Sequence, residues 1–232
     1  MPNLYYISIG LIFLLGSCNN RFMKKENSNV ELPPTLYSEF VDSTNIGIKG
    51  QSKLELRQFS GIDSCNLKIL FSVRDNSNWR EIQRFEFDMS LILDLENVMV
   101  QDYNNDGFKD FTYHSFVPAR GGNEVRKLFL YSPDKNELIY IRNSEEYPNL
   151  SYNKELDCLD AFGLYGGSST YFLNIESDTL REFARIDLWD NHRTVLTIDK
   201  YGEEKIIGED TVTEGPYIRY KNYKTLEEYT DD

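Results

Sequence analysis

Short runs of strand-forming residues, each followed by turn residues, recur from about residue 53 to residue 208 and constrain the fold most. The runs are apolar or alternate between apolar and polar residues, and the strand-favouring residues Tyr and Phe number 16 and 14. Three pairs of runs predict hairpins, over residues 128–141, 171–186 and 195–207. No long segment has a helical period, and residues 154–162 fit a short helix or a strand. We therefore predict an all-β antiparallel meander, most consistent with a small β-propeller or a propeller-like multi-sheet fold.

The segment Asp102–Asp110 has the residue spacing of a calcium-binding loop. Gly107 permits the sharp turn, because it has no Cβ to oppose a positive φ. Position 12 of the loop is Tyr113 rather than the Glu of an EF-hand, and both flanks predict strands, so we expect a β-loop that binds Ca²⁺ with a Kd of about 10⁻⁴–10⁻³ M. The alternative is a plain hairpin turn. The candidate ligands are the side chains of Asp102, Asn104, Asp106 and Asp110 and the backbone carbonyl of Phe108.

The N-terminus has the pattern of an export signal. Residues 4–15 are apolar, no charged residue precedes Arg21, and the run is too short to span a bilayer. It ends in Leu15-Gly16-Ser17-Cys18, which resembles the bacterial lipobox, although the start of the chain lacks the usual Lys or Arg. We expect a signal peptide over residues 1–17, a lipidated tether over 18–40 that begins at Cys18, and a single β-rich domain over 41–232. An ordinary secretory peptide is the alternative.

The net charge limits the classes of partner, and the cysteine content raises the question of a disulfide. The formal charge is −13, and residues 1–17 contribute nothing to it, which argues against nucleic acid and favours cationic partners or simple solubility. Two cysteines, Cys65 and Cys158, remain after Cys18. An exported chain can oxidise them to a disulfide, but the sequence leaves open whether they pair.

Two glycine-rich segments are candidates for partner binding. The first includes Gly121, Gly122 and Asn123; the second includes Gly167, Ser168 and Tyr171. Paired glycines let a backbone approach a partner closely, and tight loops within the fold are the alternative. Of the two histidines, His114 lies in a predicted strand, where we expect a packed or edge side chain, and His192 lies in a polar turn without a spaced metal partner. No H-E-x-x-H, G-x-S-x-G or phosphate-binding glycine motif is present. We therefore predict no catalytic residues.

Residues 95–220 resemble a group of bacterial periplasmic lipoproteins. The resemblance is carried by the Asp102–Asp110 loop, the turn Gly121-Gly122-Asn123, the Phe129-Leu130-Tyr131 hairpin strand and the Gly166–Tyr171 loop. The resemblance implies a calcium-loop β-propeller, similar also to integrin-type propeller repeats, that acts as an immunity protein against peptidoglycan hydrolases. Related lysozyme inhibitors insert a Ser-Gly-x-x-Tyr loop into the enzyme; Gly167–Tyr171 departs from that pattern.

The resulting hypothesis is a non-enzymatic, lipid-anchored binding protein of the bacterial cell envelope, at the periplasmic face of the outer membrane or at the cell surface. Its partner would be a basic peptidoglycan hydrolase, with Tyr171 as the anchor and recognition at the glycine segments near the calcium loop. A surface lipoprotein that binds a cell-envelope glycan or a protein is the first alternative. A cell-wall hydrolase is the second.

Overall fold

The computed structural model describes residues 34–61, 65–89, 92, 95–116, 122–213 and 215–229. These residues belong to one compact unit, Leu32–Asp232. Within them, no helix has the length and apolar character needed to cross a membrane. The predicted signal peptide and Cys18 lie outside the described residues, so the lipid anchor stays a prediction.

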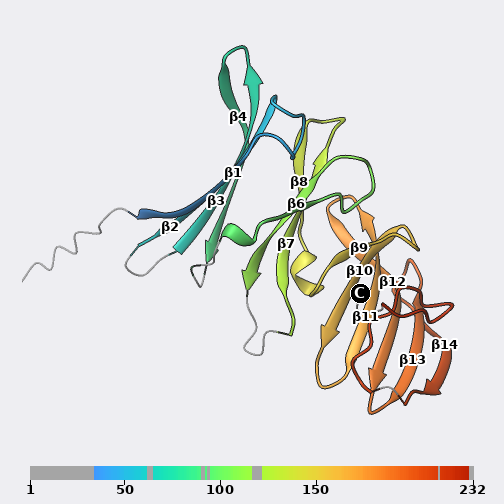
Figure 1. Cartoon of the computed structure of the whole chain (residues 1–232). Coiled ribbons are helices and arrows are strands. Elements are labelled where there is room, and N and C mark those ends of the chain that lie inside the picture. The colour runs from blue at the N-terminus through green and yellow to red at the C-terminus, as the bar shows by residue number, and fades with distance from the viewer. Residues whose placement is uncertain are drawn as a thin grey trace, which may run out of the picture. The chain divides into compact units, whose positions relative to one another are not determined.

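The described strands form three antiparallel sheets in which each strand pairs with its neighbour in sequence (Figure 1). Sheet 1 contains β1 (Thr35–Asp42), β2 (Ser52–Ser60), β3 (Cys65–Asp75) and β4 (Asn78–Met89). Sheet 2 contains β5 (Met99–Gln101), β6 (Asp110–Phe116), β7 (Val125–Ser132) and β8 (Glu137–Ile141). Sheet 3 contains β9 (Ser151–Asn153), β10 (Cys158–Leu164), β11 (Ser168–Glu176), β12 (Thr179–Trp189), β13 (His192–Ile198) and β14 (Glu204–Thr211). Two short 3-10 turns, η1 (Leu95–Asn97) and η2 (Ser144–Glu146), connect the sheets.

The predicted all-β antiparallel meander is confirmed, and the three predicted hairpins are β7–β8, β11–β12 and β13–β14. Residues 154–162 form a turn followed by most of β10. No closed or propeller-like sheet occurs among the described strands. Hairpin spacing predicts meanders, but closure depends on contacts between the first and last sheets, which the pattern along a strand does not encode. The first strand begins at Thr35, inside the range that we assign to the tether.

Sheet 2 is buried on both faces, which explains the continuous apolar run in β7. Phe129 and Tyr131 pack into a core with sheet 1, whereas Leu128 and Leu130 pack into a second core with sheet 3. Side chains alternate along a strand, so adjacent residues reach opposite faces. The first core is rich in aromatic rings; Phe111 and Phe129 stack with their centroids 4.8 Å apart.

A third core forms where the C-terminal segment 215–229 covers sheet 3. Tyr220 is fully buried in it against Phe172 and Ala184. Arg219 forms an ion pair with the buried Asp160 of β10. The hydroxyl of Tyr229 donates a hydrogen bond of 2.6 Å to the same carboxylate. This buried charge with several partners fixes the C-terminal segment on the sheet.

Candidate functional site

The Asp102–Asp110 loop joins β5 to β6, and the predicted strand flanks are present. Gln101 and Asp110 are paired across the base of the loop. Gly107 has φ +87°, and Asn105 also has a positive φ of 58°. A Cβ at Gly107 would meet nothing within 4 Å, so the backbone conformation alone favours glycine there.

The polar side chains of this loop turn back toward its own backbone. Asp102 accepts hydrogen bonds from the amides of Asp106 and Gly107, at 3.2 and 2.9 Å. Asp106 accepts one from the amide of Phe108 at 2.8 Å, and the Asn104 amide group donates to Asp106 at 3.0 Å. The repeated Asp and Asn residues therefore satisfy the turn's own N–H groups.

Asp110 ties the loop to sheet 2. Its side chain is fully buried, and its two oxygens accept hydrogen bonds from the amides of Tyr103 at 2.8 Å and Tyr131 at 2.9 Å. Burial raises the pKa of this carboxyl to about 7 against the lowering effect of the two amides, and the charges of Asp106 and Asp102 raise it as well. The sequence predicts Asp110 as a ligand, which stays a prediction; the structure shows that Asp110 braces β7.

The donor set fits a hard cation in type, since every predicted ligand atom is oxygen and the three carboxylates are near enough to repel one another. Within the described part of the chain, however, no group of three or more His, Cys, Asp or Glu side chains is placed to hold a metal ion. Asp102, Asp106 and Asp110 each accept hydrogen bonds from backbone amides, which still leaves lone pairs on every carboxylate. Calcium binding therefore stays a prediction.

The loop contacts both neighbouring sheets. Lys109 forms a parallel bridge with Ile46, in a turn whose amides bind the Asp42 carboxylate of β1. On the other side, the Asn105 amide group donates to Asp157 at 3.3 Å, in the turn 154–157 that precedes β10. We call the Asp102–Asp110 loop and the turn 154–157 the loop end. A polar hollow of about 420 Å³ lies between the Asp102–Asp110 loop and the residues Ser151, Tyr152 and Lys154.

The two predicted glycine segments come together elsewhere. The Asn123 side chain accepts from the amide of Leu164 at 2.8 Å and donates to its carbonyl at 3.0 Å. A Cβ at Gly122 would lie 3.1 Å from Leu164 Cδ1, so the first segment packs closely against the end of β10. Gly121 lies outside the described residues. We call Gly122, Asn123, the turn 165–167 and Trp189 the glycine end.

The three predicted residues of the second segment have mainly structural contacts. A Cβ at Gly167 would lie 2.2 Å from the carbonyl oxygen of Leu188 in β12, so only glycine fits at this position directly before β11. Ser168 is buried beside the backbone of Ile218. Tyr171 lies within β11, half-buried, with its ring 5.7 Å from that of Tyr147. Tyr171 is therefore part of the sheet and is not presented at the tip of a loop.

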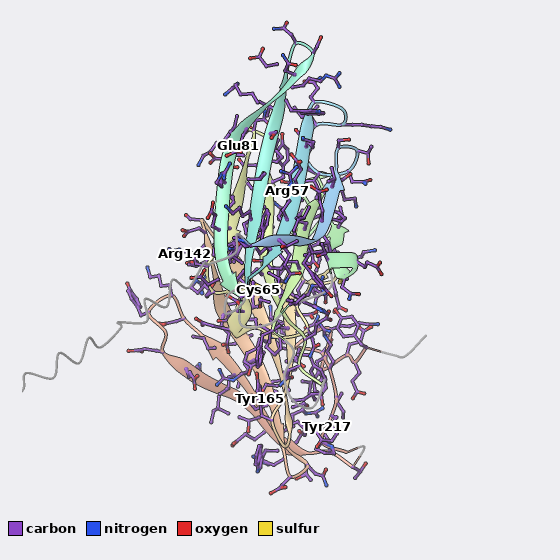
Figure 2. All side chains as sticks on the ribbon, turned by 90° about the vertical axis from the view of Figure 1, so that its left-hand side faces the viewer. Arg57, Cys65, Glu81, Arg142, Tyr165 and Tyr217 are labelled. Carbon is purple, nitrogen blue, oxygen red and sulfur yellow. The ribbon has the colours of Figure 1, made fainter. Side chains whose placement is uncertain are left out.

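Three exposed aromatic residues that the sequence reasoning missed lie around this segment. Tyr165 and Trp189 are each 58% exposed, and Tyr217 is 61% exposed. Figure 2 shows Tyr165 and Tyr217 at the same end of the structure, and Ile218, next to Tyr217, is hydrogen-bonded to Ser168. Tyr165 and Trp189 line a hollow of about 130 Å³. The sequence contained a signal for two of them. Tyr165 directly precedes a glycine pair, and Trp189 ends a strand before an Asp-Asn turn.

The loop end and the glycine end lie at opposite ends of the same strands. β6 begins at the calcium-type loop and ends toward the first glycine segment; β10 begins after the turn 154–157 and ends at Leu164. Each strand has seven residues, which corresponds to a separation of about 20 Å. The expectation that the glycine segments lie near the calcium loop is wrong, because a strand of each sheet separates them.

No family model matches the chain, and no curated protein matches it. The chain is structurally similar to one solved protein. That structure is described as "Structure of a Xanthomonas Type IV Secretion System related protein", with 10% sequence identity, a TM-score of 0.45, and coverage of 75% of this chain and 98% of the other. The family resemblance suggested by the motifs stays a prediction.

The remaining candidate groups are His114, which has structural partners, and the two cysteines, which lie in different sheets. His114 hydrogen-bonds Glu124, which also pairs with the buried Arg126; although burial raises the pKa of Glu124, these partners hold it below its usual value. Cys65 and Cys158 are both free thiols. Cys65 begins β3 of sheet 1, and Cys158 packs in the third core, so the disulfide that the sequence left open is not formed.

Proposed function

We propose that this chain is an exported, non-enzymatic binding protein of the bacterial cell envelope, anchored to the membrane through a lipid on Cys18, that inhibits a peptidoglycan hydrolase. The lipobox-like segment at residues 15–18 supports the anchor. His114 and Arg126 both bind the carboxylate of Glu124, which supports a structural role for this histidine of sheet 2.

The observation that carries the proposal is the convergence of two sequence-distant glycine segments with exposed aromatic residues at one end of the domain. The pairing of Asn123 with Leu164 brings the segments together, and Tyr165 and Trp189 stand exposed beside them. Exposed Trp and Tyr beside a hollow are typical of the residues that contribute most to protein interfaces. The formal charge of −13 would attract a basic enzyme and speed encounter.

The calcium loop has a supporting part in this proposal. Asp102, Asn104, Asp106 and the Phe108 carbonyl would bind Ca²⁺ as hard oxygen donors, and Asp110 would ligate through a remaining lone pair or through water. A bound cation would offset the repulsion between the three carboxylates and order the loop. Its place about 20 Å from the glycine end favours a bracing role over direct contact with the partner.

The decisive experiment is an inhibition assay with the purified mature protein against a panel of peptidoglycan hydrolases, with and without Ca²⁺. We expect inhibition of at least one basic enzyme. Tyr165→Ala should weaken it by about 30-fold, the scale of an interface hot spot. Tyr201→Ala is the matched control, because Tyr201 is 79% exposed but lies at the turn between β13 and β14, away from Trp189. Absence of inhibition across the panel would reject the proposal.

A cell-envelope glycan is the second candidate ligand, because Tyr165 and Trp189 are exposed together beside a hollow. Aromatic faces of this kind also stack on sugar rings. Binding to a glycan array that depends on Trp189, with no effect on any hydrolase, would favour this function over inhibition.

A further inference from the structure

The hollow beside Tyr165 and Trp189 is bounded by aromatic rings set against glycine backbone. A Cβ at Gly166 would lie 3.2 Å from Trp189 Cη2, and one at Gly163 would lie 2.5 Å from Tyr165 Cε2. The rings therefore rest on bare backbone, and more than half of each side chain remains accessible. The volume, about 130 Å³, is below the roughly 300–1,000 Å³ of small-molecule pockets and suits a single side chain.

The hollow borders a cluster of side chains with more carboxylates than cations, of which Asp187 is the one member that lines the hollow. Asp187 accepts a hydrogen bond of 2.6 Å from Ser169. The single guanidinium of Arg185 is shared among Asp187, Glu182 and Glu204, at 2.8, 2.7 and 2.9 Å. Burial raises the pKa of Glu182 against the effect of Arg185, and the charges of Asp187 and Glu204 raise it as well. One cation thus faces three carboxylates.

The other tryptophan of the chain shows the arrangement that Trp189 lacks. Trp79 has two cations of its own chain over its ring, with Lys53 Nζ and Arg74 Cζ each 5.4 Å from the ring centroid. Among the described residues, no cation lies over the ring of Trp189 or Tyr165. An accessible indole face beside Asp187, which shares its one cation with two other carboxylates, is a site where a further cation gains from both the ring and the charge.

We propose that this hollow receives a cationic side chain of the protein partner, an arginine in preference to a neutral sugar ring. The planar guanidinium stacks on an aromatic face and can donate to a carboxylate in the same pose. A neutral sugar ring would gain the stacking and could donate hydroxyl hydrogen bonds to Asp187, but it would bring no positive charge to offset the carboxylates. The identity of the partner rests on the proposed function. The preference for arginine depends only on the residues that line the hollow.

The test follows the indole N–H signal of Trp189 by NMR in the Trp79→Phe protein, which leaves one tryptophan. The probes are N-acetyl-arginine amide, N-acetyl-citrulline amide as the uncharged isostere, and chitotriose as the sugar. We expect a saturable shift with the arginine probe and at least tenfold weaker binding of citrulline. Asp187→Asn should weaken the arginine response, whereas Asp134→Asn, an exposed turn residue, should not. Equal binding of citrulline, binding of chitotriose alone, or no saturable shift would each overturn the inference.

A hydrolase assay separates this inference from the proposed function. If a hydrolase is inhibited and Trp189→Ala inhibits equally well, the hollow is not the arginine site and the proposed function stands. If no hydrolase is inhibited but the arginine probe still saturates Trp189, the proposed function falls and the hollow remains a guanidinium site. The Trp189 variant should keep its thermal unfolding midpoint near that of the parent, because more than half of the side chain is exposed.

Discussion

The loop end and the glycine end of this domain both contain dense sequence motifs. They differ in how far their side chains are already bonded or packed within the fold. At the loop end, Asp102, Asp106 and Asp110 each already accept hydrogen bonds from backbone amides. At the glycine end, Tyr165 and Trp189 remain 58% exposed, with no ring or cation partner among the described residues. A motif whose polar groups are bonded within the fold braces it, whereas exposed aromatic surface is available to a partner.

The largest effect should come from Asp110→Ala at the loop end. The change removes the acceptor of the buried amides of Tyr103 and Tyr131, and each buried donor left without a partner costs about 1–3 kcal/mol. We expect a loss of about 3 kcal/mol in the free energy of unfolding, measured by urea denaturation without added metal. Asp106→Ala, in the exposed part of the same loop, should lose less than 1 kcal/mol. Equal losses would contradict the bracing role of Asp110.

The next effect is the response of the loop end to Ca²⁺. At 100 times its Kd the ion should add about 2.7 kcal/mol to the free energy of unfolding and raise the melting temperature. Asp106→Ala should abolish the response. Asp199→Ala is the matched control, because the Asp199 carboxylate accepts hydrogen bonds from the backbone amides of Tyr201 and Glu203 in an ordinary hairpin turn. A parent protein that melts identically in EDTA and in Ca²⁺ has no calcium site, and the loop is then a turn alone.

The sequence predicted the meanders better than the arrangement of the sheets, and the physical reasons differ by region. The β7–β8 hairpin was predictable because Ser132–Asn136 is turn chemistry between apolar runs. The distribution of Phe129 and Leu128 between two cores was not, because a run buried on both faces has no alternation to read. Whether the sheets form an open or a closed arrangement was not predictable either, because it depends on contacts between strands that are distant in sequence.

The candidate site was predicted in part for similar reasons. The residue types of the loop end were recognisable from spacing, but the burial of Asp110 against Tyr131 depends on β7, which is distant in sequence. The glycine segments were recognisable as unusual, but not their pairing through Asn123 and Leu164. Tyr165 and Trp189 were overlooked because a single aromatic residue near a turn carries little information until strand register places the two together.

Asp42 offers a pH test of how sheet 1 supports the loop end. Burial raises the pKa of this carboxyl, but hydrogen bonds from Thr44, Ile46 and Asn45 outweigh it and hold the pKa below its usual 3.8. A lowered folded pKa gives stability that is present above pH 3.8 and lost as the pH falls through the folded value. Asp42→Asn should therefore cost about 1–2 kcal/mol at pH 7 and converge with the parent as the pH falls through the lowered folded pKa, measured by urea midpoints. A pH-independent difference would contradict this linkage.

The smallest stability effect should come from Asn123→Ala at the glycine end, and it separates stability from function most sharply. Asn123 makes two part-buried hydrogen bonds to the backbone of Leu164, so we expect a loss of about 1 kcal/mol. Asn143 is a matched control, because it makes the same two bonds to Leu180, at the opposite end of β12 from Trp189. Both alanine variants should unfold at similar urea concentrations. Only Asn123→Ala should speed hydrogen exchange at Leu164 and weaken hydrolase inhibition, by at least tenfold, because of the two variants it alone releases the first glycine segment from Leu164, the residue before the turn 165–167. Equal inhibition by the two variants would remove the glycine end from the proposed binding surface.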